Sequence, residues 1–183
     1  MKRSVSIFIL FLSLQTFAQD DGPAYPEFIN TTSEINVTDS LLIDSITPQM
    51  KPLDSSAVKK WFSRILPAGN NNRLKNRNYY LAGKITTHNN FDLLLLMEEK
   101  KRADSSLGQT VYFVTLKKDG TYISSLEAAV TGTRKKTSFY TSSWLYKDYK
   151  IVKDSQMIIN QKTYDDMACY KINGTGRFIL NSN

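Results

Sequence analysis

The segment Thr110–Leu126, TVYFVTLKKDGTYISSL, predicts an antiparallel β-hairpin. Two runs of β-branched and aromatic residues flank Asp119-Gly120, a pair typical of the turn between two antiparallel strands. A three-residue loop that ends at Gly120 would pair Leu116 with Tyr122, whereas a two-residue turn would shift this register by one. We favour the longer loop, because Gly120 then occupies the left-handed conformation that other residues avoid. A hairpin alone is marginally stable in water, so this one must belong to a larger sheet.

The chain after residue 79 continues the same pattern of short strand-like runs separated by polar, Gly-containing or Asn-containing connectors. The predicted strands are Tyr79–Thr87, Phe91–Glu99, Gln109–Lys117, Thr121–Val130, Thr137–Tyr146, Tyr149–Lys153, Gln156–Lys162, Met167–Ile172 and Arg177–Leu180. Asp154-Ser155 and Tyr164–Asp166 are interpreted as connectors. This spacing predicts a mainly β fold, an antiparallel meander that forms a sandwich or a small barrel.

One short amphipathic helix is predicted before the strands. Val58, Trp61, Phe62, Ile65 and Leu66 follow helical spacing and form one apolar stripe, which Pro67 ends. So short a helix is unstable alone, so we expect it to pack on the sheet. The predicted core residues are Trp61, Phe62, Leu94, Leu96, Val114 and Ile172.

The first 18 residues have the pattern of a secretory signal peptide. Lys2-Arg3 precede an apolar run, Val5–Leu14, and a small residue, Ala18, stands at the expected cleavage point. The alternative, a membrane anchor, needs about 20 apolar residues. We therefore expect export to the periplasm or the extracellular space, with cleavage near Ala18.

Charge divides the remaining chain into two parts. Residues 19–57 contain seven acidic residues and one basic residue, whereas residues 58–183 contain 21 basic and 10 acidic residues. All five prolines lie in the first 67 residues, and proline is excluded from central strands. We therefore predict an acidic, irregular arm over 19–57 and a helix plus β domain over 58–183. The arm either lies on the basic domain or stays solvated.

The chain offers little for catalysis. His88 is the only histidine and Cys169 the only cysteine, so neither a zinc site nor a His-dependent nucleophile can be assembled in a usual way. The adjacent acids Asp165-Asp166 resemble a turn more than a catalytic pair. We therefore predict no catalytic residue, no metal and no cofactor, and favour a protein that is not an enzyme.

Basic clusters interleaved with aromatic residues are the stronger functional signal, because such surfaces bind anionic ligands. The candidate binding residues are Arg134, Lys135, Lys136, Tyr140, Trp144, Tyr146, Lys147 and Tyr149. The alternative is that these lysines only protect sheet edges. An acidic glycan, a membrane surface or an acidic protein would suit an exported protein, whereas nucleic acid would not. Ser40 and Ser45 lie in Asp-Ser-apolar triplets, which resemble a bacterial O-glycosylation acceptor.

Four stretches form a set of motifs: YYLAGKI (79–85), NFDLL (90–94), YFVTLKKDG (112–120) and YKI (170–172), the last closing at Gly176-Arg-Phe178. Together they resemble exported β-rich proteins of unknown function from Bacteroidota-type bacteria. The resemblance covers residues 79–180 and implies an exported β domain, but no activity. We interpret the protein as an exported binding or interaction module with a basic, aromatic-bearing face. The alternatives are an immunity or inhibitor protein that blocks a periplasmic enzyme, and a small hydrolase.

Overall fold

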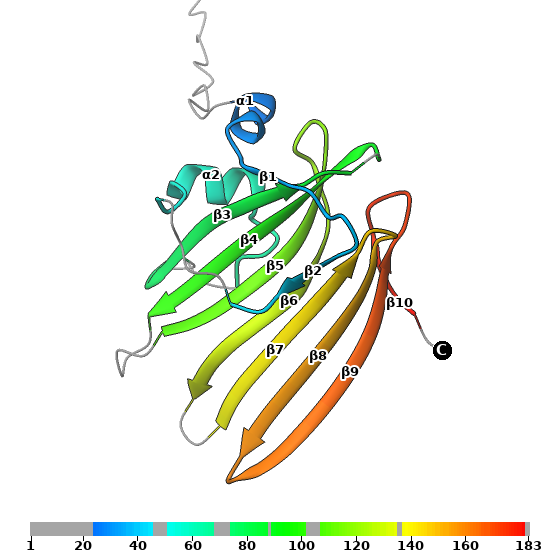
Figure 1. Ribbon diagram of the computed structural model, residues 1–183. Coiled ribbons are helices and arrows are strands. Elements are labelled where there is room, and N and C mark those ends of the chain that lie inside the picture. Colours follow the sequence, from blue (N-terminus) through cyan, green and yellow to red (C-terminus); the bar gives the residue numbers. More distant parts are fainter. Residues whose placement is uncertain are drawn as a thin grey trace, which may run out of the picture.

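The computed structural model describes residues 24–45, 51–67, 74–87, 89–101, 107–134 and 137–181, and Figure 1 shows their arrangement. The signal peptide prediction lies outside these residues. These described residues form ten strands and two short helices. The elements are α1 (Tyr25–Asn30), β1 (Glu34–Ile35), β2 (Ser40–Ile43), α2 (Ser55–Trp61), β3 (Arg77–Ile85), β4 (Phe91–Lys101), β5 (Leu107–Lys117), β6 (Tyr122–Arg134), β7 (Thr137–Tyr146), β8 (Lys150–Ile159), β9 (Lys162–Ile172) and β10 (Phe178–Leu180).

The strands belong to one sheet in which β3 to β10 pair in sequence order as an antiparallel meander. At the β3 end of this meander, β1 pairs with β3 in parallel. In its interior, β2 pairs with the C-terminal half of β7, beyond the residues of β7 that pair with β6. The prediction of a mainly β fold is confirmed. The finer prediction of a sandwich or small barrel is not, because the order of the described strands is that of an open sheet.

The central hairpin has the predicted three-residue loop. Leu116 pairs with Tyr122, and Gly120 has a φ of 86°, the left-handed conformation that glycine adopts without strain. The Lys117 N–H donates to the carbonyl of Thr121, which closes the loop at 2.8 Å. The choice of register is therefore confirmed.

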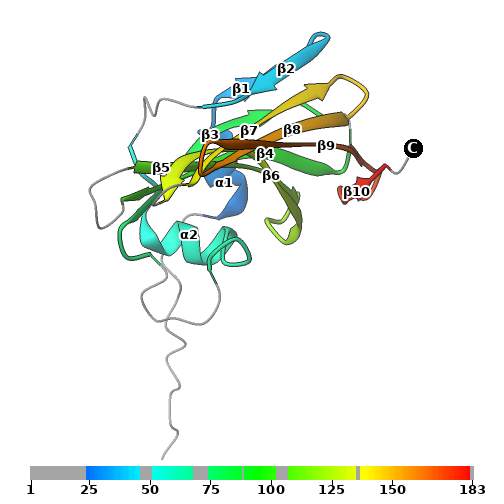
Figure 2. The same cartoon turned by 90° about the horizontal axis from the view of Figure 1, so that it is seen from below.

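Strand β4 is covered on both faces, which fits the nearly continuous apolar run from Phe91 to Met97. One core, on the face of Leu94 and Leu96, includes residues of α1 and α2. A larger core, on the face of Leu93 and Leu95, includes residues of β2, β7, β8 and β9. Figure 2 shows the two helices on one side of the sheet and the β1–β2 segment on the other.

The sheet curls over the larger core, so that its C-terminal end meets its middle. The Phe178 ring of β10 stacks on Phe113 of β5, with 6.4 Å between ring centroids. In addition, the Thr115 hydroxyl donates to the carbonyl of Gly176, in the β9–β10 turn, at 2.6 Å. These contacts hold β10 against β5 although β5 and β10 are not neighbours in the sheet.

Helix α2 covers only the first part of the predicted apolar stripe, since it ends at Trp61. Phe62 is fully buried, whereas Trp61 is partly buried and covers Gly120. The other four predicted core residues, in β4, β5 and β9, are buried. Helix α1 was not predicted, because six residues are too few for a clear periodic pattern.

The described part of the acidic segment is not an irregular arm. It contains α1, β1 and β2, and it buries Tyr25, Ile29 and Ile43 in the two cores. The hydroxyl of Tyr25 also donates to the buried carboxylate of Asp92 at 3.0 Å. Burial of these apolar side chains makes the described part of the segment an integral part of the fold, despite its acidic composition. It is not a separate arm that lies on the surface of the basic domain.

Strands β8 and β9 are longer than predicted. The turn between them is at Asn160-Gln161, whose φ values of 48° and 68° fit a two-residue hairpin turn. The proposed connectors at Asp154-Ser155 and Tyr164–Asp166 were wrong, because these residues continue the strands. Polar side chains were mistaken for turn signals here, although they face solvent from an exposed hairpin.

Candidate functional site

The predicted aromatic residues of β7 lie together on one face of the sheet. Tyr140, Trp144 and Tyr146 are two or four positions apart, so their side chains point the same way, and they are 47%, 42% and 38% exposed. We call this the outer face of β2, β7, β8, β9 and β10. The opposite, inner face carries Leu145 and Ile151 of the larger core.

The pairing of β2, β8 and β9 with or beside β7 places further apolar side chains next to these aromatic residues on the outer face. Leu42 of β2 pairs with Trp144, which pairs with Val152 of β8, which pairs with Cys169 of β9. Met167, the most exposed large apolar side chain in the described part at 71%, lies on the same face two residues from Cys169. Nine large apolar side chains are exposed among the described residues, and the register places seven of them on this face. The seven are Leu42, Tyr140, Trp144, Tyr146, Ile158, Met167 and Ile179.

Charges on the outer face are mixed and not uniformly basic. Lys150 and Lys171 pair with each other near Tyr146, whereas Asp154 and Asp165 face outward further along β8 and β9. The Lys147 ammonium in the adjacent turn lies 3.9 Å from a carboxylate oxygen of Asp39, and both side chains are exposed. Positive charge therefore gathers at the Tyr146 end of this face.

The described backbone of Arg134, and Tyr149, do not join this surface. The backbone of Arg134 ends β6 opposite Thr137, at the far end of β7 from Lys147. At about 3.3 Å per strand residue, the length of β7 separates the two residues by roughly 30 Å. The Arg134 side chain, Lys135 and Lys136 lie outside the described part of the structure. Tyr149 has a φ of 64° and packs against the larger core. The described members of the predicted set thus belong to three places and not to one cluster.

Of the two predicted glycosylation sites, Ser40 is in β2, where it pairs with Tyr146 and is exposed. Ser45 follows β2, and its N–H donates to the neighbouring Asp44 carboxylate. Modification of either hydroxyl stays a prediction.

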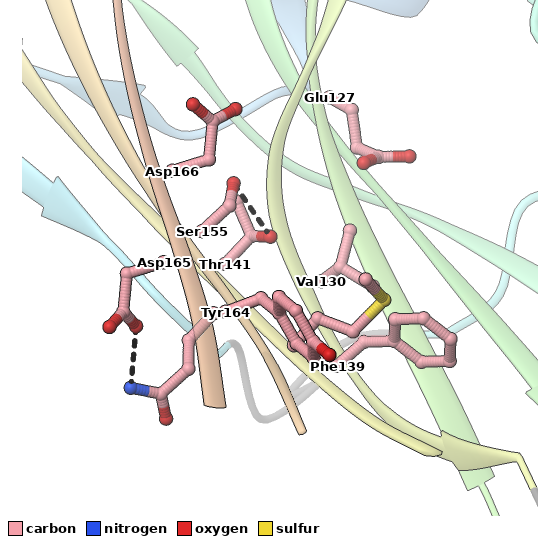
Figure 3. Close-up of a pocket in the computed structure, with 10 residues that line it drawn as sticks. Glu127, Val130, Phe139, Thr141, Ser155, Tyr164, Asp165 and Asp166 are labelled. Carbon is pink, nitrogen blue, oxygen red and sulfur yellow. Dashed lines mark hydrogen bonds between the residues drawn. The ribbon is translucent and has the colours of Figure 1, made fainter. Parts of the chain in front are cut away.

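A pocket of about 300 Å³ opens on the inner face of β6–β9 (Figure 3). The register arranges its side chains in two adjacent rows. Phe139, Met157 and Tyr164 form an apolar row across β7, β8 and β9, and Thr141, Ser155 and Asp166 form a polar row beside it. Figure 3 shows Tyr164 and Phe139 at one end of the pocket, and Asp166 and Glu127 at the other.

Hydrogen bonds and one ion pair fix the polar end of the pocket. The Thr141 hydroxyl donates to that of Ser155 at 3.2 Å. The Glu127 carboxylate lies 3.7 Å from the ammonium of Lys153, whose side chain is mostly buried. Gln156 and Asp165 touch the edge of the pocket, but their side chains face outward, where the Gln156 amide donates to the Asp165 carboxylate at 3.0 Å. Sequence reasoning missed this site, because its rows depend on the register of three strands.

Two buried carboxylates elsewhere in β4 hold the fold together. Asp92 lies 2.6 Å from the Lys118 ammonium, and Glu98 accepts hydrogen bonds from the Arg77 guanidinium and the Tyr79 hydroxyl. Burial, with the adjacent Glu98 carboxylate, raises the pKa of Tyr79 far above its usual value. Burial and the Asp92 carboxylate raise the pKa of Tyr25 in the same way. These contacts tie the segment before β3 and the start of β3 to the central strand.

The described residues contain no group of three His, Cys, Asp or Glu side chains suited to a metal ion. His88 lies outside them, and Cys169 is a partly buried member of the outer-face row. No helix in the described ranges is both long and apolar enough to cross a membrane. No family model, no curated protein and no solved structure matches the chain.

Proposed function

We propose that the protein is an exported binding module that docks a protein partner on the outer face. The observation that carries this proposal is the gathering of seven of the nine exposed large apolar side chains on one face. Single exposed apolar residues are normal on a protein surface, but a contiguous group commonly marks an interaction site.

The composition of the outer face fits the anatomy of a protein interface. Leu42, Trp144 and Val152 form an apolar centre in one cross-strand row, and charged residues such as Lys150 and Asp154 lie beside it. Interfaces combine an apolar centre with a polar rim and are enriched in aromatic residues. Trp144 is therefore the expected energetic centre, because tryptophan is over-represented among residues that dominate binding.

The size of the face favours a weak or transient complex. Five strands about 4.8 Å apart span roughly 20 Å, and the stretch of β7 from Tyr140 to Tyr146 spans about another 20 Å. Each partner would thus bury roughly 400 Å², well below the 800 Å² or so of a standard interface.

Charge favours an acidic partner. The chain carries a net charge of +7, and Lys147, Lys150 and Lys171 stand at the Tyr146 end of the face. Such charges speed association with a partner of opposite sign and make it sensitive to salt. If the partner is an enzyme, the protein is an inhibitor or an immunity protein. Identification of the captured partner distinguishes this role from that of a general binding module.

The test is capture of exported proteins by the mature chain, starting after Ala18, and by a variant with Leu42→Ser and Trp144→Ser. The matched control is Tyr164→Ser, which alters an exposed aromatic residue on the inner face. We expect one acidic protein to bind the native chain and the control, and to be lost from the double variant.

Equal capture by all three chains would refute the outer face as the binding surface. The thermal midpoint of each variant is measured first, so that lost binding is not confused with lost folding. Binding of an acidic polysaccharide or of anionic vesicles, with no bound protein, would overturn the choice of a protein partner.

A further inference from the structure

We propose that the pocket on the inner face binds a small amphipathic cation, an aromatic or alkyl group joined to an ammonium. This site lies on the opposite face of β7, β8 and β9 from the proposed docking surface, so neither proposal depends on the other. Its volume of about 300 Å³ falls at the lower end of the range for small-molecule sites.

The apolar row provides the place for the non-polar part of the ligand. Phe139 and Tyr164 come from β7 and β9, and the flexible side chain of Met157 lies between them on β8. Val130 of β6, which pairs with Thr141, adds an apolar side chain between the two ends of the pocket (Figure 3). Aromatic rings here can receive an apolar ring, and their faces also attract a cation.

The polar row determines the chemistry of the other end. The hydroxyls of Thr141 and Ser155 are hydrogen-bonded to each other, so Ser155 can still donate to or accept from a ligand. Asp166 follows in the same row, and no ion pair or hydrogen bond joins its carboxylate to another described side chain. A carboxylate accepts hydrogen bonds and cannot donate them, so it selects a donor.

The charges that border the pocket favour a cation over an anion. Glu127 and Asp166 are acidic and line the pocket on the inner face, and the nearby Lys153, two residues from Ser155 on the same face of β8, is paired with Glu127. The pocket is thus a negative region in a chain whose net charge is +7. Since an apolar cavity wall focuses the field of nearby charges, a cation is attracted and an anion of the same shape is repelled.

The strand geometry also sets the length of the ligand. Tyr164 and Asp166 are two residues apart on one face of β9, which separates their Cα atoms by about 7 Å. Thr141 and Phe139 on β7, and Ser155 and Met157 on β8, repeat the same spacing. An aromatic ring joined to an ammonium through two or three methylene groups matches this distance.

The test uses 2-phenylethylammonium as the probe and 3-phenylpropionate as an anion of similar shape. Binding is followed by NMR of chain labelled at its methionine methyl groups, in which the Met157 signal reports on the apolar row. We expect a saturable shift of this signal with the ammonium, and binding of the carboxylate at least about tenfold weaker.

Variants separate this site from non-specific attraction to the protein. Asp166→Asn should weaken binding of the ammonium about tenfold, and Tyr164→Ser should weaken both probes. Asp154→Asn removes a carboxylate from the outer face of β8 and should leave the affinity unchanged.

Three results would overturn the proposal. They are no shift of the Met157 signal with the ammonium, equal affinity for the two probes, and equal affinity in the Asp166→Asn and native chains. Thermal midpoints of the variants show that each remains folded during the titration.

Discussion

Replacement of Gly120 by alanine tests how closely the central hairpin loop packs under the helical segment. A Cβ atom on Gly120 would lie 2.6 Å from Cζ3 of Trp61 and 2.8 Å from Cγ of Tyr25. Its left-handed conformation costs a non-glycine residue about 1–2 kcal/mol. Overpacking against the two rings adds about 1–3 kcal/mol. We therefore expect the free energy of unfolding to fall by about 2–5 kcal/mol.

The matched control for Gly120 is Gly174→Ala. Gly174 lies in the β9–β10 turn, and a Cβ atom there meets no atom within 4 Å. Its replacement should change the free energy of unfolding by less than about 0.5 kcal/mol. Urea unfolding measures both variants, provided that the slope of the free energy with urea concentration is unchanged. Equal stabilities of the two variants would refute the packing of Trp61 and Tyr25 on the loop.

Two further predictions concern stability. Phe62→Ala should lower the free energy of unfolding in urea by about 3–5 kcal/mol, because Phe62 is fully buried in the core under the helices. The control Leu42→Ala, at an exposed residue, should lower it much less. Similar losses in the two variants would contradict the docking of α2. Burial, with neighbouring carboxylates, raises the pKa values of Tyr25, Tyr79 and Tyr112 above the usual 10. Above pH 10 the unfolded chain therefore loses phenol protons that the folded chain retains, and stability should fall by about 1.4 kcal/mol per pH unit for each tyrosine. A urea midpoint that stays constant from pH 9 to 11 would contradict this reasoning.

Local signals in the sequence were sufficient to predict the hairpin and the core of the central strands. Gly120 occupies a conformation that few other residues tolerate, so one residue decided the loop length and the register of Leu116. The continuous apolar run of β4 required cover on both faces, and the two cores provide it. In both cases the cause lies within a few residues of the effect.

Features that depend on distant pairing could not be predicted in the same way. Nothing near Leu42 indicates that β2 pairs with β7, about a hundred residues later. The turn at Asn160-Gln161 contains no glycine, so the polar residues of β9 were mistaken for the turn itself. The inner-face pocket was missed for the same reason, since its two rows exist only in the observed register.

The predicted aromatic and basic residues illustrate both situations. Tyr140, Trp144 and Tyr146 share a face because strand side chains alternate, which the sequence predicts directly. Arg134 and Lys147 are separated by the length of β7, so closeness in sequence did not mean closeness in space. The outer face is consequently more apolar and less basic than the sequence predicted.

The most direct test of the outer face as the docking surface is hydroxyl-radical footprinting of the chain, free and bound to its captured partner. Met167 and Trp144 are the exposed reporters on the outer face, and Tyr164 is an exposed reporter on the inner face. The proposed docking predicts that oxidation of Met167 and Trp144 falls severalfold in the complex, while oxidation of Tyr164 is unchanged. Protection of Tyr164 with unchanged oxidation of Met167 and Trp144 would contradict it.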